Sequence, residues 1–236
     1  MNSESTNQPV CIVTGGTSGI GRETVRLFAK NGYRIATCGR DPERLQEVRN
    51  ELGDSETHIV EQVDLNQIDQ AQQFTKQVVD TFGQVDLLVN NAAVSPLGPF
   101  DAITEETFEQ TLNINVRSPF RITQSVWRQM TEQGRGVVVN ISSLAAVDPF
   151  PGFSIYGASK AWLDLLTTAL KTEGEEHNIR VYSVRAGAVE TPMLRGLFPD
   201  FPADQCVSPA DIANTILACV ENKHESGSHI VVANQT

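Results

Sequence analysis

Short apolar runs alternate with longer amphipathic stretches along nearly the whole chain of 236 residues, and this alternation limits the possible folds most strongly. The apolar runs are rich in β-branched residues with few polar interruptions, which is typical of parallel strands covered on both faces. The stretches between them, such as 19–32 and 69–83, have the spacing of helices. The strand-like runs are 10–15, 34–39, 57–64, 85–92, 136–143, 180–187 and 229–234. This order predicts an α/β fold, a doubly wound sheet of about seven mostly parallel strands flanked by helices.

No repeat or low-complexity linker divides the chain, so we predict one domain over 9–236, preceded by a flexible N-terminus over 1–8. The first eight residues are polar, and no apolar run is long enough to span a bilayer. We therefore expect a cytoplasmic protein without a membrane partner. The net charge of −11 argues against a nucleic-acid partner, because binding phosphates needs clustered lysine and arginine.

Four cysteines are present, and none belongs to a C-x-x-C pair or has metal-ligand spacing with a histidine. Cys11, Cys38 and Cys219 lie in apolar runs, which favours small core residues in a reducing compartment. We therefore predict no metal site.

A glycine-rich turn, TGGTSGIG at 14–21, stands between the first strand-like run and the first helix-like stretch. Gly15 permits a tight turn, Gly19 lets the backbone approach a pyrophosphate, and Gly21 lets helix and strand pack closely. The start of the helix also presents free N–H groups to an anion. This position of a G-x-x-x-G-x-G turn predicts a dinucleotide site. The residues between the glycines are expected to contact the cofactor as well: Thr17, Ser18 and Ile20.

The end of the second strand should face the adenosine ribose, where NAD-binding proteins place an acidic residue on the 2′-hydroxyl. This chain has Gly39 there, followed by Arg40, whose guanidinium can pair with a 2′-phosphate. The sequence therefore favours NADP over NAD. In the alternative, Arg40 only forms a surface ion pair with Asp41 or Glu43.

The stretch SIYGASKAW at 154–162 places Tyr156 and Lys160 four residues apart, and such residues lie on one face of a helix. The lysine is then close enough to act on the phenol. Many helices carry such a pair by chance, so the pair gains meaning only from the rest of the chain.

The segment 188–207 holds Pro192, Pro199 and Pro202 among large apolar side chains. We expect a loop, either a substrate lid over a pocket or a loop packed onto its own core. Arg195 in this segment could receive a carboxylate or phosphate, or remain solvated.

Together these segments resemble the short-chain dehydrogenase/reductase family over nearly the whole chain, with the landmarks in the family's order. The turn at 14–21 resembles its cofactor turn, NNAA at 90–93 its NNAG element, and VRAGAVETP at 184–192 its P-G-x-x-x-T segment. Ala93 and Ala186 are departures, since the family has glycine and proline there. The family's asparagine, serine, tyrosine and lysine match Asn115, Ser143, Tyr156 and Lys160.

The resemblance implies a Rossmann-type domain, hydride transfer between a nicotinamide and a carbonyl or alcohol, and these four residues as the catalytic group. Tyr156 would be the general acid or base, with its pKa, ordinarily ~10, lowered by the cation of Lys160. Lys160 would also hold the nicotinamide ribose, Ser143 would hydrogen-bond the substrate oxygen, and Asn115 would bend its helix and hold a relay water. Two alternatives stay open: Ser142 as the hydroxyl instead of Ser143, and Asn115 as a buried amide that serves backbone groups.

The resemblance also implies that Tyr156 and Lys160 contact the cofactor, in addition to the glycine-rich turn. It assigns further cofactor contacts as well. It places Asp64 and Leu65 at the adenine, Asn91 and Ala92 beside the adenosine, and Val189 and Thr191 at the nicotinamide carboxamide. Alanine at 186 should loosen the turn that carries Val189 and Thr191, and alanine at 93 requires a backbone without positive φ.

The expected pocket walls, 144–153 and 192–202, are apolar and aromatic. We therefore predict an NADP(H)-dependent oxidoreductase for a small, fairly apolar carbonyl compound or secondary alcohol. Alternatives are an NAD-preferring enzyme of the same family, a non-catalytic dinucleotide sensor, and a structural domain that binds nothing. The helices expected near 104–131 and 155–175 carry apolar residues on more than one face, and the family commonly pairs them between subunits. This implies a homodimer or homotetramer.

Overall fold

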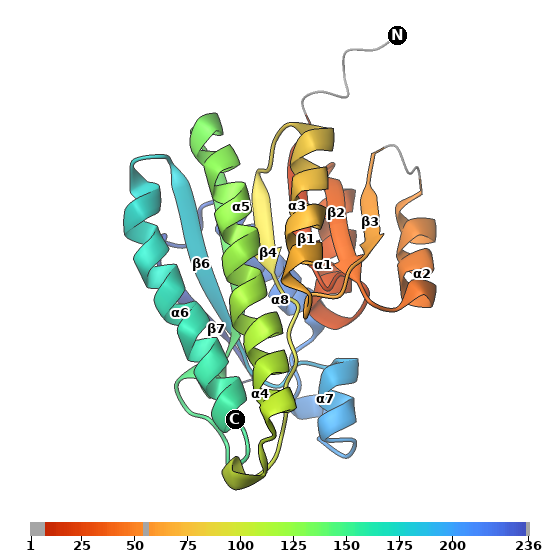
Figure 1. Cartoon of the computed structure of the whole chain (residues 1–236), viewed down its shortest axis with the longest axis vertical. Coiled ribbons are helices and arrows are strands. Elements are labelled where there is room, and N and C mark those ends of the chain that lie inside the picture. Colours follow the sequence, from red (N-terminus) through yellow and green to blue (C-terminus); the bar gives the residue numbers. More distant parts are fainter. Residues whose placement is uncertain (1–7, 54–56, 235–236) are drawn as a thin grey trace.

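The computed structural model describes residues 8–53 and 57–234, so all but Gln8 of the predicted flexible N-terminus lies outside the described residues. Within them, seven strands form one sheet in the order β3-β2-β1-β4-β5-β6-β7, and every neighbouring pair is parallel. The predicted doubly wound α/β fold is thereby confirmed (Figure 1). The strands are β1 (Val10–Thr14), β2 (Arg34–Gly39), β3 (Ile59–Gln62), β4 (Leu87–Asn90), β5 (Gly136–Ser143), β6 (Ile179–Ala186) and β7 (His229–Val232).

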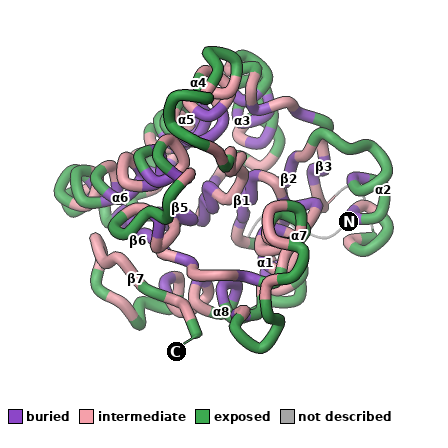
Figure 2. Tube along the Cα trace, turned by 90° about the horizontal axis from the view of Figure 1, so that it is seen from below, coloured by how far each residue is buried: buried purple, intermediate pink, exposed green. Residues whose placement is uncertain are grey.

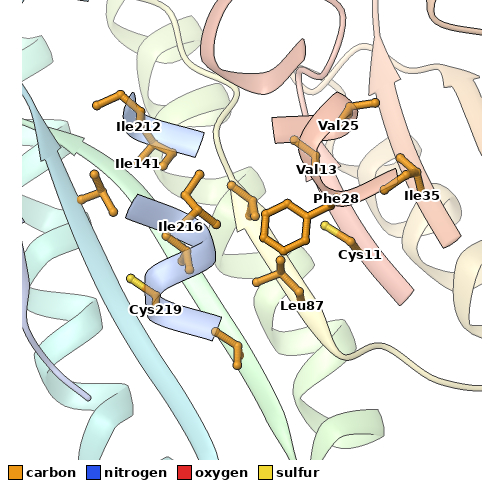
Figure 3. Packing of buried hydrophobic residues seen from close by; sticks show 14 of the residues in the cluster. Cys11, Val13, Val25, Phe28, Ile35, Leu87, Ile141, Ile212, Ile216 and Cys219 are labelled. Carbon is orange, nitrogen blue, oxygen red and sulfur yellow. The ribbon is translucent and has the colours of Figure 1, made fainter. Parts of the chain in front are cut away.

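Helices cover both faces of the sheet, because successive strand residues point to opposite sides. In β1, Val13 belongs to one core cluster and Ile12 to the other. Helices α1, α2 and α8 cover the first face, where the ring of Phe28 points toward Cys11 and Leu87 (Figure 3). Helices α3, α5 and α6 pack on the second face. The helices are α1 (Gly19–Lys30), α2 (Pro42–Leu52), α3 (Ile68–Phe82), α4 (Glu105–Leu112), α5 (Ser118–Gln133), α6 (Ser154–Glu175), α7 (Pro192–Leu197) and α8 (Pro209–Val220).

The long helix expected near 104–131 is interrupted between α4 and α5. A π-helical segment, Asn113–Arg117, joins the two. Such turns often occur at functional sites. The side-chain amide of Asn115 in this segment binds the backbone N–H and C=O of Val94, which ties the distorted turn to the loop after β4. The local distortion expected at Asn115 is therefore observed. Among the described helices, none combines the length and the apolar character needed to cross a bilayer.

The 188–207 segment, expected to be a loop, contains the short helix α7. The Thr191 hydroxyl accepts a hydrogen bond from the N–H of Leu194 at 3.2 Å, and Pro192 occupies the first helical position. Proline is favoured there because that N–H has no helical partner, so it starts this helix instead of breaking it. The loop expectation is wrong for this part. The two ends of the segment are joined by a parallel bridge between Val189 and Val207.

The sheet order reverses between β1 and β4, and in doubly wound sheets this point opens a crevice at the carboxyl ends of the strands. The glycine-rich turn follows β1, and residues 91–93 follow β4. Figure 2 views the molecule from below, with the exposed and half-buried α7 in front of the largely buried strands. The site described next lies in this crevice.

Candidate active site and cofactor cavity

The glycine-rich turn is held in one shape by its neighbours. Gly15 has a φ of +69°, and a Cβ on it would lie 3.1 Å from Ala92. A Cβ on Gly21 would lie 2.3 Å from the carbonyl oxygen of Gly15, so a side chain there would push α1 away from the turn. The side-chain amide of Asn91 donates to the carbonyls of Thr14 (2.8 Å) and Gly15 (3.2 Å). The conformational reasons expected for Gly15 and Gly21 are therefore observed.

The middle of the turn touches both neighbouring elements of the site. Gly19 has a φ of +52°, and a Cβ on it would lie 2.9 Å from the methyl group of Thr191. Thr17 packs against β2 so closely that a Cβ on Gly39 would lie 2.7 Å from its methyl group. Ser18 precedes α1 at the capping position, and its hydroxyl makes no capping hydrogen bond. That hydroxyl and the first N–H groups of α1 are suited to an anion.

A cavity of about 1070 Å³ runs from this turn to the predicted catalytic residues. Its glycine cradle, which any side chain would fill, fits an extended dinucleotide with the pyrophosphate at the start of α1. Gly21 and the buried Asn115 are not among the residues that line the cavity. The other predicted site residues line it: Gly15, Thr17, Ser18, Gly19, Ile20, Arg40, Asp64, Leu65, Asn91, Ala92, Ser143, Tyr156, Lys160, Val189 and Thr191.

Ser143, Tyr156 and Lys160 meet where β5 ends and α6 begins. The Ser143 hydroxyl is near enough to the Tyr156 phenol to act on its pKa, and it accepts a hydrogen bond from the N–H of Ala145 at 3.1 Å. Lys160 is 2% exposed; its ammonium donates to the carbonyl of Ile141 at 2.7 Å and lies 5.7 Å from the centre of the Tyr156 ring. The tyrosine and the lysine therefore share one face of α6, as their spacing predicts.

The alternative hydroxyl, Ser142, is engaged elsewhere. It is buried, and it donates to the backbone carbonyl of Lys160 at 3.3 Å. Its bond joins β5 to α6, whereas the hydroxyl of Ser143 acts on the pKa of Tyr156. The geometry favours Ser143 as the residue that meets a substrate.

Burial decides the protonation of the tyrosine and the lysine, because it disfavours their charged forms. It raises the pKa of Tyr156, and the Ser143 hydroxyl only partly opposes this effect. Burial lowers the pKa of Lys160 to about 8, against the attraction of the nearby Asp164 carboxylate. The expectation that Lys160 brings the pKa of Tyr156 below its usual value is wrong, because removing the phenolate from water has the larger effect.

Asn115 takes the form of a buried amide that serves backbone groups, the alternative left open above. Its Oδ1 accepts from the N–H of Val94, and its Nδ2 donates to the carbonyl of Val94, both at 2.9 Å. Nδ2 also donates to the hydroxyl of Ser159 at 3.0 Å. Since Ser159 precedes Lys160, this amide links the loop after β4 to the turn of α6 that carries Lys160. The relay water stays a prediction.

Two exposed guanidinium groups border the end of the cavity that the sequence assigns to the adenosine. Arg40 forms no ion pair among residues 8–53 and 57–234. Asp41, its expected alternative partner, instead caps α2 and pairs with Arg44 at 3.4 Å. Arg44 lines the same cavity and was not predicted. Its position in the first turn of α2, four residues after Arg40, is the sequence signal that could have found it.

The two departures from the family pattern leave the backbone regular. Ala93 does not have a positive φ. Ala186 is the last residue of β6 and lies in register with Ser143 of β5 and Val232 of β7. The turn that Ala186 was expected to loosen therefore starts from an anchored strand, and Val189 beyond it is held by its bridge.

Aromatic side chains form the wall opposite the glycine turn. The ring centre of Phe153 lies 5.4 Å from that of Tyr156, 6.1 Å from that of Phe198 and 6.2 Å from that of Phe150. The 188–207 segment and the loop before α6 thus meet beside Tyr156. This wall suits an apolar ligand.

Arg195 is bound within the 188–207 segment itself. Its guanidinium pairs with Glu190 and donates to the carbonyls of Pro199 (3.1 Å) and Phe201 (2.6 Å). Neither expectation for Arg195, a ligand for an anion or a solvated side chain, matches this arrangement. The arginine instead ties the segment into a fixed shape.

Comparisons with known proteins extend along nearly the whole chain. The family described as short chain dehydrogenase matches residues 9–201. Carbonyl reductase (NADPH) 2 of Sus scrofa is 33% identical over 234 residues, which cover 94% of this chain and 93% of that protein. Among solved structures, a 3-ketoacyl-(acyl-carrier-protein) reductase from Brucella melitensis complexed with NADH is 26% identical with a TM-score of 0.87, covering 95% of this chain and 96% of that one. An actinorhodin polyketide ketoreductase with NADPH is 28% identical with a TM-score of 0.89, covering 97% of both chains.

Proposed function

This chain belongs to the short-chain dehydrogenase/reductase family, and from that premise we propose that it is an NADP(H)-preferring reductase of small, fairly apolar carbonyl compounds. As a member of the family it is an oxidoreductase that interconverts carbonyl and alcohol groups with a nicotinamide dinucleotide. One observation carries the proposal. A single cavity has Ser143, Tyr156 and Lys160 at one end and the guanidinium groups of Arg40 and Arg44 at the other.

Tyr156 is the general acid of the proposed reaction. When bound, the nicotinamide supplies a hydride to the carbonyl carbon, and negative charge develops on the carbonyl oxygen. Because burial raises its pKa, Tyr156 is protonated at neutral pH and donates its phenolic proton to that oxygen. Ser143 donates a second hydrogen bond to the same oxygen. In alcohol oxidation Tyr156, as the phenolate, accepts the proton of the alcohol hydroxyl, and Ser143 hydrogen-bonds the same oxygen.

Lys160 and Asn115 support this proton transfer from behind. The ammonium of Lys160, held on the carbonyl of Ile141, lies below the Tyr156 ring and attracts the phenolate that proton transfer leaves. We also propose that Lys160 holds the nicotinamide ribose. Asn115 fixes this turn of α6 through Ser159, and we retain the proposal that its π-helical segment holds a water that returns a proton to Lys160.

The cofactor preference rests on the adenosine end of the cavity. Arg40, without an ion pair in the described part of the chain, and its neighbour Arg44 can bind a 2′-phosphate from two sides. The remaining contacts are proposed for the glycine turn at the pyrophosphate, Asp64 and Leu65 at the adenine, Asn91 and Ala92 beside the adenosine, and Val189 and Thr191 at the carboxamide. The NADH complex of the Brucella melitensis relative keeps an NAD-preferring enzyme as the competing hypothesis.

The proposed substrate class rests on the few charged side chains at the substrate end of the cavity. The charged side chains that line the cavity in the described structure are Arg40, Asp41, Arg44, Asp64 and Lys160. All but Lys160 stand at the adenosine end, and the substrate end is walled by the aromatic cluster around Phe153. A neutral ketone, aldehyde or secondary alcohol fits such a wall better than a charged compound.

The proposal is tested by following NADPH oxidation with a panel of ketones, aldehydes, diketones and quinones, with Tyr156→Phe in parallel. We expect turnover that falls roughly 100- to 10,000-fold in the variant, because the proton donor is lost. NADPH binding, measured as a rise in melting temperature, should survive the substitution. Binding without turnover on any compound would favour the dinucleotide sensor, and no binding would favour the structural domain.

We also propose a cytoplasmic homodimer or homotetramer. Helices α5 and α6 leave Phe120 and Leu165 38% and 70% exposed, and Phe120 stacks edge-on against Trp162 of the neighbouring helix. An apolar face of this kind is suited to a second copy of the chain. Light scattering after gel filtration measures the mass, and a monomer at all concentrations contradicts the proposal.

A further inference from the structure

Asp164 is a buried carboxylate on α6, one helical turn beyond Lys160 and outside the cavity wall. It is 6% exposed. Its two oxygens accept hydrogen bonds from the hydroxyl of Ser183 and from Nε of Arg185, at 2.5 and 2.7 Å. Both partners lie on β6. A buried charge with a charged partner and a second hydrogen bond is held in one geometry.

These bonds attach α6 to β6. The preceding turn of α6, which carries Lys160, is attached to β5. Lys160 donates through its ammonium to a carbonyl of β5 and accepts from Ser142 through its backbone. In the sheet, Ser142 lies in register with Arg185. Asp164 and Lys160 therefore bind consecutive turns of α6 to two adjacent strands, and one of these strands ends in Ser143. The helix position that places the tyrosine depends on both attachments.

The carboxylate also faces more than one positive group. Arg185 pairs with it from β6, and Nδ1 of His229 on β7 lies 3.7 Å away, while Lys160 stands one turn earlier on α6. Tyr156 is the other titratable group beside Lys160. The negative charge of Asp164 raises the pKa of Lys160 against the effect of burial. Arg185 shares the same carboxylate and so weakens its action on the lysine.

We propose that Asp164, held by Ser183 and Arg185, is a positioning residue that keeps Lys160 in register below Tyr156. The proposal rests on the function proposed above. It requires opposite effects from two substitutions. Asp164→Asn removes the negative charge, so Lys160 releases its proton at lower pH. Arg185→Gln removes the cation paired with the carboxylate, so the negative charge acts more strongly on Lys160 and the lysine keeps its proton to higher pH.

The charge of Lys160 can be measured without cofactor or turnover. Lysine side chains labelled with ¹³C at Cε are titrated by NMR, and the Lys160 signal is assigned by its loss in Lys160→Met. We expect its midpoint to move down by about one pH unit in Asp164→Asn and up in Arg185→Gln. The alkaline limb of the pH profile of kcat should move in the same two directions.

Asp86→Asn is the matched control. Asp86 is likewise a partly buried carboxylate with an arginine partner, Arg135 at 3.0 Å, and a second bond, from the N–H of Val10 at 2.9 Å. It precedes β4, at the amino ends of the strands, whereas the cavity lies at their carboxyl ends. This variant should lower the melting temperature and leave both the Lys160 titration and the pH profile in place.

The outcomes separate the two proposals. The role of Asp164 is overturned if the Lys160 titration midpoint stays in place in both variants. It is also overturned if the midpoint moves in the same direction in Asp164→Asn and Arg185→Gln. If Asp164→Asn does not fold, the upward shift in Arg185→Gln against the Asp86→Asn control still decides the question. A further outcome is that the Lys160 titration midpoint shifts in opposite directions in the two variants while the protein reduces no carbonyl compound. That result would support the link between Asp164 and Lys160 and would overturn the proposed reaction instead.

Discussion

The two ends of the cavity are built in different ways. At the catalytic end, Lys160 is buried and donates to a backbone carbonyl of β5, and Ser143 terminates the same strand. At the adenosine end, Arg40 and Arg44 are exposed on a loop and a helix start. Buried groups with fixed partners set geometry and protonation, whereas exposed charges act in water and are screened by salt. Substitutions at the first end should therefore change rates and pKa values, and those at the second should change cofactor affinity.

The sharpest test at the catalytic end compares two adjacent serines. Ser143→Ala should lower kcat roughly 100- to 1,000-fold with NADPH affinity retained, because a hydrogen bond to the developing oxyanion is lost. Ser142→Ala should leave kcat close to that of the unmodified protein and lower the free energy of unfolding by about 1 kcal/mol, since it loses one bond between β5 and α6. Steady-state kinetics and urea unfolding measure both. Equal losses of kcat in the two variants would contradict the assignment of Ser143.

The buried lysine should leave a mark on stability. The pKa of Lys160 is 10.5 ordinarily and about 8 in the folded protein. Below pH 8 both the folded and the unfolded chain hold the proton, so the folded protein bears the full penalty of a buried charge. Between the two values the unfolded chain binds more protons, and the free energy of unfolding rises with pH.

Lys160→Met removes this titration. The variant should therefore be more stable than the unmodified protein at pH 7, by roughly 3 kcal/mol at most, and this difference should close toward pH 10. Urea unfolding of both proteins without cofactor, at pH 7 and at pH 10, measures it. A difference in stability that does not change with pH would show that the ammonium is better solvated than its burial indicates.

The features that could be predicted from the sequence are mainly those of the backbone. The strand runs are almost continuously apolar because both faces of the sheet are covered, so all seven were found in place. The positions of Gly15 and Gly21 were predictable because their constraint belongs to the backbone, a positive φ in one case and a 2.3 Å approach in the other. Such features depend on local spacing, which a sequence displays directly.

The errors concern side chains whose surroundings come from distant parts of the chain. The spacing of Tyr156 and Lys160 was correct, yet the direction of the tyrosine's pKa was wrong, because burial depends on what packs around the ring. The ion pair between Arg195 and Glu190 depends on how the 188–207 segment folds back on itself. The position of Arg44 near Arg40 depends on where α2 begins. Neither produces a motif.

At the adenosine end, Arg40→Ala and Arg44→Ala should each weaken NADPH binding by about tenfold, the loss of one charge-assisted contact. NADH binding should hardly change, since it has no 2′-phosphate. Fluorescence titration at low and high salt measures both, and higher salt should reduce the difference between variant and unmodified protein. Equal affinity of the unmodified protein for NADH and NADPH would support the NAD-preferring alternative.

The smallest effect of a substitution is expected in the 188–207 segment. Its side chains are partly exposed, as at the adenosine end, but Arg195 has fixed partners within the segment, as Lys160 has at the other end. Arg195→Ala removes the bonds to Glu190, Pro199 and Phe201, so the segment should sample more shapes and KM for the carbonyl substrate should rise about two- to fivefold. Arg128→Ala is the control, because Arg128 forms an exposed ion pair with Glu132 on α5. Kinetics with both variants separate the two possibilities for the segment. A raised KM with constant kcat supports a lid that shapes the substrate site, whereas no difference from the control supports a loop that packs only on the protein's own core.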